Sequence, residues 1–500
     1  MLFESLLVAG LAAGADSTLL RILATNDFHG ALDARVYGWS NGRPVGGAAA
    51  LKATLDSAAV GCRCPVLRLD GGDQMQGSLG SNLVYGRSVV EVMNAVGLDA
   101  AVVGNHELDW GVDTLRARMG EAKYPWLAAN VFDSLTGKRP GWAVPYTILT
   151  RGRLRIGVVG YMAQRTKAMV SAGAAKGLIW KRGPDAIGDV LAAVRAERPD
   201  LTILVAHEGA FCDSLPCAGE IVDLARGLDS TIVQLIVSGH THSLVHTVVN
   251  GIPIVQARSN GTAYGVADLV RRDDGSRAWK VRVETVWADR VTPDSGITAI
   301  VARYRPMVDR IAGQPVAELR DPLTRDGQQY PLGNLIADAQ RAAAPGTDFA
   351  LMNNGGIRRD LRAGQITYSD LFELQPFANN ITQVWITGSQ LHDLLEFAVG
   401  GGAPRFHLSG LAVRYDLAKP RGSRIVSMRS ASGAPIQPAR TYVLALSDFL
   451  QEGGEGLNLL RTLPSHRTGK TDLEALIAYL KAMPQPVTPP RDVRFAPVSP

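Results

Sequence analysis

Short apolar runs alternate with polar loops along the first half of the chain. Each run is rich in β-branched and aliphatic residues, and a loop of Asp, Asn, His and Gly and then an amphipathic stretch follow it. The runs predict strands at 19–25, 66–69, 100–103, 155–159 and 201–205. Strands that alternate with helices indicate a layered α/β fold.

The pattern changes further along the chain. Strand-like runs at 232–237, 244–249 and 252–256 follow one another with little helix between them, which predicts a sheet that completes the first domain. Apolar positions recur at helical spacing over 295–312, where Pro306 is expected to kink a helix. A second unit then has a predicted helix at 332–343, strands at 349–352, 382–387 and 442–445, and an irregular Pro-rich end from Pro484.

The chain has 500 residues, which at roughly 150 residues per domain indicates two to four domains. We expect a signal peptide at 1–16, a first domain at 17–295, a linker helix at 296–316, a second domain at 317–490 and a tail at 491–500. No apolar run after the first stretch is long enough to cross a bilayer.

The first stretch has the pattern of a secretory signal. Residues 5–15 are apolar and small, and Ala13-Gly14-Ala15 offers a small-x-small cleavage site. This predicts a periplasmic or secreted protein. Because Glu4 precedes the apolar run without any Lys or Arg, a start codon further upstream or a buried N-terminal element is the alternative.

Composition and charge exclude some classes of protein and of partner. Hydrophobic residues make up 46% of the chain and charged residues 20%, which excludes wholesale disorder. The net charge of +5 is not gathered in a Lys/Arg block, so we expect no nucleic-acid polymer as a partner. Composition leaves open whether the protein is a monomer or a homodimer.

The four cysteines lie in two close pairs, Cys62 with Cys64 and Cys212 with Cys217. An even count in an exported chain favours disulfides, and we expect local pairing. Free buried thiols are the alternative, above all for the closely spaced first pair.

Candidate metal ligands occupy five loops, each directly after a predicted strand: Asp27, His29, Asp73, Asn105, His207, His240 and His242. Such loops are where an α/β sheet collects its ligand site. In an extended segment, residues i and i+2 face the same way, so the Asp-x-His and His-x-His pairs can each present two ligands to one cavity. Taken singly, each loop is more often a turn or a core histidine. Together, in this order, they predict a shared site.

The donors indicate the kind of metal. Imidazole with carboxylate or amide oxygen suits zinc, manganese, cobalt or iron. We expect two divalent ions, which at roughly 3.5 to 4 Å apart can share a carboxylate, supply a hydroxide nucleophile and neutralise a phosphoryl group.

The order D-x-H, G-G-D, G-N-H-E-x-D, H and G-H-T-H resembles that of the calcineurin-like metallophosphoesterases, and a second set of motifs extends the resemblance to the 5′-nucleotidase family over nearly the whole chain. The resemblance implies a four-layer α/β/β/α sandwich with a separate α/β C-terminal nucleotide-binding domain. It assigns Asp27, His29 and His242 to one ion, Asn105, His207 and His240 to the other, and Asp73 as the bridge. His106 and Asp109 match the catalytic dyad, with His106 facing the phosphoryl group and Asp109 orienting its ring.

The second domain carries the motifs that the family uses for its substrate. Paired glycines in NNGGIR let backbone approach a ligand, and the Arg that follows offers phosphate a bidentate fork. In the family, two aromatic residues sandwich the base, and Phe377 and Phe449 match them here. Glu455 stands where the family usually has an Asp that binds the ribose. The matching substrate-binding positions are Arg325, Asn353, Gly355, Gly356, Arg358, Phe377, Asn379, Gly410, Phe449 and Glu455.

The resemblance implies an exported phosphohydrolase with a nucleotide substrate. The expected reaction is hydrolysis of nucleoside 5′-monophosphates to nucleoside and phosphate by in-line attack of a metal-bound hydroxide. Alternatives on the same site are a 2′,3′-cyclic nucleotide phosphodiesterase and a nucleotide-sugar diphosphatase. An alternative of another class is a non-catalytic nucleotide-binding surface protein.

Overall fold

The computed structural model describes residues 17–170, 173–212 and 216–498, so the expected signal peptide at 1–16 lies outside the described residues. Two six-stranded sheets form the first part of the chain. The first has the order β16 (Arg277–Thr285), β15 (Ala263–Arg271), β1 (Ser17–Thr25), β4 (Val66–Asp70), β5 (Ala100–Val102) and β6 (Trp126–Leu127). The second has the order β13 (Leu244–Val249), β14 (Ile252–Ala257), β12 (Leu235–Ser238), β11 (Leu201–Ala206), β9 (Leu154–Tyr161) and β8 (Tyr146–Arg151).

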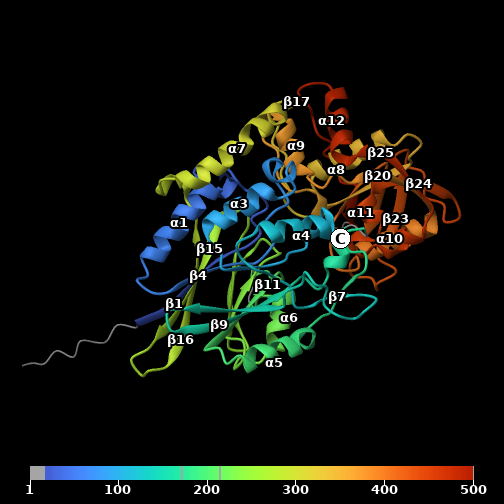
Figure 1. Cartoon of the computed structure of the whole chain (residues 1–500). Coiled ribbons are helices and arrows are strands. Elements are labelled where there is room, and N and C mark those ends of the chain that lie inside the picture. Colours follow the sequence, from blue (N-terminus) through green and yellow to red (C-terminus); the bar gives the residue numbers. More distant parts are fainter. Residues whose placement is uncertain (1–16, 171–172, 213–215, 499–500) are drawn as a thin grey trace, which may run out of the picture.

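The two sheets pack face to face, with helices on both outer sides (Figure 1). Apolar side chains from both sheets, such as Ile22 and Val205, fill the layer between them and are fully buried. The helices α1 (Ala48–Val60), α3 (Arg87–Val96) and α4 (Gly111–Glu121) cover the first sheet, and α5 (Gly188–Ala196) and α6 (Glu220–Arg226) cover the second. The layers are therefore α/β/β/α. Because the inner strands β11 and β12 are buried on both faces, they read as continuous apolar runs in the sequence.

All eight strands expected in the first part are confirmed, with ends that differ by at most three residues. The strands that precede the candidate ligand loops run parallel, since β1 pairs with β4, β4 with β5, and β11 with β12 in that sense. Their carboxyl ends therefore open at the same edge of each sheet.

The second part is built on a five-stranded sheet, and its predicted helix and strands are confirmed. The order is β21 (Phe406–Ser409), β18 (Phe349–Asn353), β24 (Thr441–Ser447), β20 (Asn380–Thr387) and β25 (Ser465–Thr471). One face packs on α8 (Pro331–Ala343), α9 (Tyr368–Leu374) and α12 (Asp472–Ala482), and the other on α10 (Gly388–Ala398). A small sheet of β23 (Ile425–Ser430), β22 (Leu411–Tyr415) and β26 (Phe495–Pro497) extends the second face.

One detail differs from the sequence expectation. The chain end is not irregular throughout, because β26 pairs with β22 and buries Phe495 in the core of the second part. Helix α7 (Ser295–Ala312) has the expected span and includes Pro306. It is capped by Asp294, whose carboxylate accepts a hydrogen bond from the Ile297 N–H at 2.8 Å.

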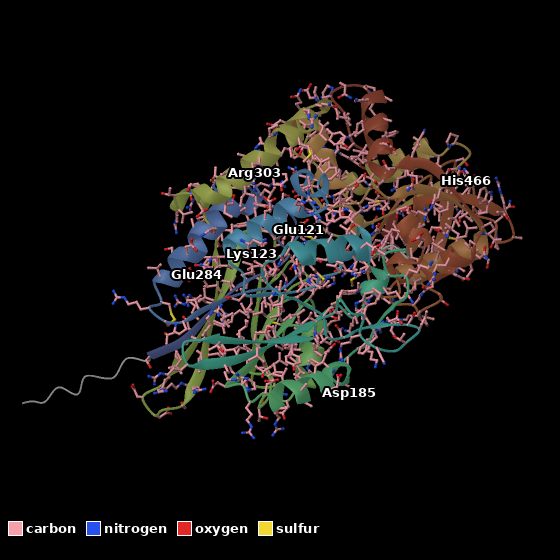
Figure 2. The ribbon with its side chains drawn as sticks, viewed as in Figure 1. Glu121, Lys123, Asp185, Glu284, Arg303 and His466 are labelled. Carbon is pink, nitrogen blue, oxygen red and sulfur yellow. A yellow bond between two sulfur atoms is a disulfide. The ribbon has the colours of Figure 1, made fainter. Side chains whose placement is uncertain are left out.

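Helix α7 lies along the first part and reaches α9 of the second (Figure 1). Its Tyr304 hydroxyl donates to Glu91 of α3 at 2.8 Å, and Arg303, labelled in Figure 2, pairs with the same carboxylate. None of the described helices is both long and apolar enough to span a membrane. The local disulfides Cys62–Cys64 and Cys212–Cys217 are both formed, as expected.

His407 of β21 is fully buried away from the candidate ligand loops. Its ring lies 4.3 Å from that of Tyr330, and neither ring nitrogen has a hydrogen-bond partner among the described residues. Burial lowers the pKa of His407 to about 3. The folded protein therefore holds a neutral imidazole that the unfolded chain, with an ordinary His pKa, would protonate below pH ~6.5.

We predict that His407 makes the fold sensitive to acid. Its contribution to stability is complete above pH ~6.5 and is lost at about 1.4 kcal/mol per pH unit as the pH falls toward 3. Urea unfolding of chelator-treated protein between pH 7.5 and 4.5 measures this, with His407→Phe as the control that cannot titrate. Parallel losses in the two proteins would contradict the prediction.

Candidate functional site

Five loops at the carboxyl ends of β1, β4, β5, β11 and β12 bring the seven candidate ligands together. Two groups of three can each hold a metal ion, and within each group the ligand atoms lie within 4.8 Å of one another: Asp27, His29 and His242 in the first, and Asp73, His207 and His240 in the second. The first-domain ligands that are far apart in sequence are therefore close in space.

In the first cluster, two histidine ring nitrogens lie directly opposite each other. His29 Nε2 lies 2.9 Å from His242 Nε2, which in turn lies 3.5 Å from Asp27 Oδ1. The other ring nitrogen of His29, Nδ1, donates to the Gln76 carbonyl at 2.8 Å. This bond fixes the tautomer that presents a lone pair on Nε2, which is how metal-binding histidines are usually oriented.

The second cluster is built in the same way. His207 Nδ1 donates to the Gly71 carbonyl at 2.7 Å, and its Nε2 faces Asp73 Oδ2 at 3.0 Å and Asn105 Oδ1 at 3.1 Å. The same oxygen of Asp73 lies 3.9 Å from His29 Nε2 of the first cluster. Asp73 is thus the carboxylate that lies between the two clusters.

The backbone at these ligands is unusual. Asp27, His29, Asp73, His240 and His242 all have left-handed conformations, with φ between 49° and 79°. Our expectation that an extended segment pairs residues i and i+2 is therefore wrong in its geometry, although the pairs do converge. Left-handed backbone is costly for residues other than glycine and persists where the surrounding structure enforces it, often at functional sites.

Charge and burial fit these residues to divalent cations. Burial lowers the pKa of His29 and of His240 to about 3, so both imidazoles are neutral and free to donate a lone pair. Burial also opposes protonation of His207, but the Asp73 carboxylate raises its pKa to about 10. Cation binding would displace that proton. A set of neutral imidazoles around one central carboxylate, with further oxygen donors, is the donor chemistry that such ions prefer.

His106 and Asp109 lie beside the clusters as the predicted pair. His106 Nδ1 donates to Asp109 Oδ2 at 2.8 Å, and Nε2 faces Asp73 Oδ2 at 4.0 Å. Burial disfavours the imidazolium, but Asp109 and Asp73 raise the pKa of His106 above its ordinary value. The backbone N–H of His106 donates to Asp73 Oδ1 at 2.8 Å, which ties the dyad to the central carboxylate.

Sequence reasoning missed Glu107, which is fully buried under the same loops. Its carboxylate accepts hydrogen bonds of 2.8 to 3.2 Å from the backbone N–H groups of Gly104, Asp73, Gln74 and Met75. It therefore fixes the β4 loop against the β5 loop. The available signal was an acidic residue within an apolar motif next to His106, where a carboxylate must be satisfied by hydrogen bonds.

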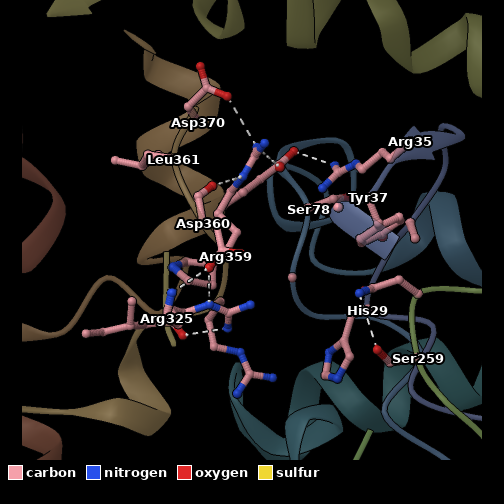
Figure 3. Close-up of a pocket in the computed structure, with 18 of the residues that line it drawn as sticks. His29, Arg35, Tyr37, Ser78, Ser259, Arg325, Arg359, Asp360, Leu361 and Asp370 are labelled. Atoms are coloured by element: carbon pink, nitrogen blue, oxygen red, sulfur yellow. Dashed lines mark hydrogen bonds and ion pairs between the residues drawn. The ribbon is translucent and has the colours of Figure 1, made fainter. Parts of the chain in front are cut away.

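A cleft of about 1140 Å³ separates the two parts of the chain at this edge. Figure 3 shows His29, Tyr37 and Ser259 on one wall and Arg325, Arg359 and Asp360 on the other. The two walls also touch. Arg35 pairs with Glu373 at 2.6 Å, and the side chains of Gln76 and Asn82 donate to the Pro376 carbonyl.

The predicted Arg358 lies in this cleft, close enough to the clusters that its charge helps to lower the pKa of His29 and of His242. Its guanidinium carbon is 5.6 Å from the centre of the Phe377 ring, which stacks on the His106 ring at 5.5 Å. Arg325 also lines the cleft and is held by Asp360 at 2.9 Å. The second part of the chain therefore places a cation and an aromatic ring directly over the dyad.

Other predicted substrate residues form their own contacts. Asn353 donates to Glu455 at 2.9 Å, and the NNGGIR turn lies against the same carboxylate at Gly355. Gly356, in the same turn, packs against Met352. Phe449 packs on the core of the second part, beside Gly454.

Two further predicted positions make their contacts within the second part of the chain. Asn379 donates to Asp472 at 3.1 Å, at the start of α12. Gly410 forms a left-handed turn between β21 and β22 and packs on the Asp348 carbonyl. Both contacts are structural in kind.

Comparison with known proteins agrees with this arrangement. Residues 20–244 match the family model of calcineurin-like phosphoesterases, and residues 312–462 match that of the 5′-nucleotidase C-terminal domain. The chain belongs to the 5′-nucleotidase family. It is a phosphoric ester hydrolase with the expected metallophosphoesterase fold, and this fold implies divalent metal ions.

Individual relatives cover most of the chain. The 5′-nucleotidase of Vibrio cholerae is 29% identical over 97% of this chain and 93% of its own length. The endonuclease YhcR of Bacillus subtilis is 30% identical over 95% of this chain, which spans 41% of that relative's length. Among solved structures, a 5′-nucleotidase precursor of Thermus thermophilus has a TM-score of 0.86 and 26% identity, and covers 96% of this chain and 100% of its own.

Proposed function

We propose that this member of the 5′-nucleotidase family is an exported, metal-dependent enzyme that hydrolyses nucleoside 5′-monophosphates to nucleoside and phosphate. One observation carries the proposal: Asp73 lies between two clusters of metal-binding side chains, and a His–Asp dyad faces the same carboxylate. Two bound cations would neutralise the phosphoryl group and activate water. We assign each side chain to the ion of its own cluster. Asn105 contributes a further oxygen donor next to His207.

The dyad acts on the phosphoryl oxygens. Asp109 holds the His106 ring by its Nδ1 and favours the imidazolium, so Nε2–H can donate to negative charge that develops in the transition state. Arg358 adds a second positive group on the opposite wall of the cleft. Both groups are held before substrate binds, which removes the cost of arranging them during the reaction.

The second part of the chain selects the leaving nucleoside. We infer that Phe377 and Phe449 contact the base, that Asn353 and Glu455 contact the ribose, and that Arg325 and Arg358 contact phosphate. The turn glycines Gly355 and Gly356 let Glu455 and Met352 pack close to the backbone beside Asn353. Asn379 and Gly410 support this region through packing. The division into a catalytic unit at 17–295, a linker at 296–316 and a recognition unit at 317–490 belongs to the same proposal.

Export is supported by the two disulfides, which persist in oxidising compartments. We therefore place the protein in the periplasm or outside the cell. Snake-venom 5′-nucleotidases are among its relatives, at 28% identity over 95% of this chain.

Phosphate release from a substrate panel tests the proposal. We predict that nucleoside 5′-monophosphates are hydrolysed faster than 2′,3′-cyclic nucleotides or nucleotide sugars, because a terminal phosphoryl group offers more free oxygens to the donors His106 and Arg358. Chelator is expected to abolish release, and zinc, manganese, cobalt or iron to restore it. Chelator-resistant hydrolysis, or a cyclic nucleotide as the best substrate, would refute the assignment.

A further inference from the structure

An aromatic group that the proposed reaction does not use begins at the cleft, where Tyr37 belongs to the lining, and continues outward through Trp39, which lies beyond that lining. Tyr37 and Trp39 stack on each other, with ring centres 5.8 Å apart and planes inclined by 21°. Trp287 meets Trp39 edge to face at 6.3 Å. Trp39 is 43% exposed, so a large ring that ordinarily contributes to a core is presented to solvent here.

Cations surround these rings. Arg258 lies over Trp39 at 4.9 Å and Arg43 over Trp287 at 4.0 Å. Arg43 is neutralised by Asp289 at 2.6 Å, and it fixes the position of Trp287. For Arg258, no ion pair is found in the part of the chain that the structure describes. Arg362, from the opposite wall, donates to the Val36 carbonyl at 2.7 Å and likewise has no carboxylate partner among the described residues.

The cleft connects this group to the metal-binding clusters. Its lining runs from His29 and His242 past Ser259 and Asn260 to Tyr37, and Figure 3 shows Tyr37, Ser259 and His29 on the same wall. Its volume of about 1140 Å³ exceeds the roughly 300–1,000 Å³ of typical small-ligand pockets. The space is therefore larger than one mononucleotide needs.

We propose that Tyr37 and Trp39 form a second base-stacking subsite, which holds the outer nucleoside of a dinucleoside phosphodiester while its phosphorus lies at the clusters. Aromatic rings beside arginines that have no carboxylate partner are a combination that binds nucleotides without strict base preference. The inference rests on the proposed function, because the same centre would carry out the hydrolysis.

The reaction is a hydrolysis and needs no further reactant. The oxygen of water bonds to phosphorus, and the P–O bond to the nucleoside held by the second part of the chain breaks. The departing oxygen takes a proton from water and leaves as an alcohol. The other product is a nucleotide whose base remains on Tyr37 and Trp39.

The dinucleoside monophosphate ApA and AMP serve as paired probes for the full-length protein. We expect Trp39→Ala to raise KM for ApA about tenfold and to change KM and kcat for AMP less than about twofold. Calorimetric titration of chelator-treated protein should show the same tenfold rise in Kd for ApA without any turnover. Trp39→Leu, which keeps the apolar contact but lacks a π-face, is expected to behave like Trp39→Ala, and Trp39→Phe like the wild type.

Trp385→Ala is the matched control, since Trp385 is similarly exposed at 38% but lies on β20, whereas Trp39 stacks on the cleft residue Tyr37. Thermal unfolding of each variant shows whether Trp39 only stabilises its loop. Equal effects of Trp39→Ala on ApA and AMP, an equal effect of Trp385→Ala, or AMP hydrolysis without ApA hydrolysis would overturn the inference. Failure to cleave either probe would refute the proposed function, while Trp39-dependent binding of ApA in the calorimeter would still support the subsite.

Discussion

The variant Asp73→Asn is expected to lose phosphate release by at least about 10³-fold and to retain at most one of the two divalent ions. Asp73 Oδ2 lies 3.0 Å from His207 and 3.9 Å from His29, so one carboxylate serves both clusters. An amide keeps the shape and can still accept the His106 N–H bond, but it lacks the charge that holds two cations close together. Several kcal/mol of transition-state stabilisation depend on those cations, and this corresponds to the stated loss.

Elemental analysis of purified protein, combined with phosphate release from AMP, measures both parts of this prediction. Asp472→Asn is the matched control. Asp472 is equally buried but lies in the second part of the chain, where burial raises its pKa to about 7 and an amide replaces it at little electrostatic cost. Two ions per chain and normal turnover in Asp73→Asn would remove Asp73 from the centre.

The convergence of the candidate metal ligands could be predicted because two local signals agree at each of them. An apolar run indicates a strand end, and a polar motif follows directly, as at His207 after β11. Parallel pairing then brings the loops to one edge. What the sequence could not reveal is the left-handed backbone at Asp27 and His29, which allows the side chains to converge and depends on contacts with distant loops, such as the N–H of His29 donating to the Asp73 carbonyl.

The substrate side was harder to predict, because it depends on how two separately folded parts meet. The sequence predicts that Phe377 stacks on a base, and it could not reveal that the Phe377 ring also lies on His106. Asn379 and Gly410 match substrate-binding positions of the family motifs, but their contacts lie within the second part of the chain. The Tyr37 loop carried no recognised motif, and its role emerges only from its position at the cleft.

Substituting His106 by Ala is expected to lower kcat for AMP by about 10² to 10⁴-fold and to leave nucleotide binding and metal content intact. The ring is placed by the Nδ1 bond to Asp109 and the stack on Phe377, and it also meets the His29 ring edge to face at 5.4 Å. His106 itself offers no ligand atom to either cluster. Its loss removes a positive donor that acts on charge present mainly in the transition state, so kcat should fall while Kd stays the same.

Asp109→Asn separates charge from position. Its amide oxygen can still accept the His106 Nδ1–H bond, so the ring remains oriented, but the carboxylate that raises the pKa of His106 is gone. We expect a loss of about tenfold, smaller than that of His106→Ala, because the donor is weakened rather than removed. Rapid-quench measurement of a single turnover gives the chemical step directly. If His106→Ala and Asp109→Asn were equally slow, the contribution of His106 would lie in its charge alone. If neither variant slowed the chemical step, the transition state would have to be stabilised by Arg358 and the bound cations without the dyad.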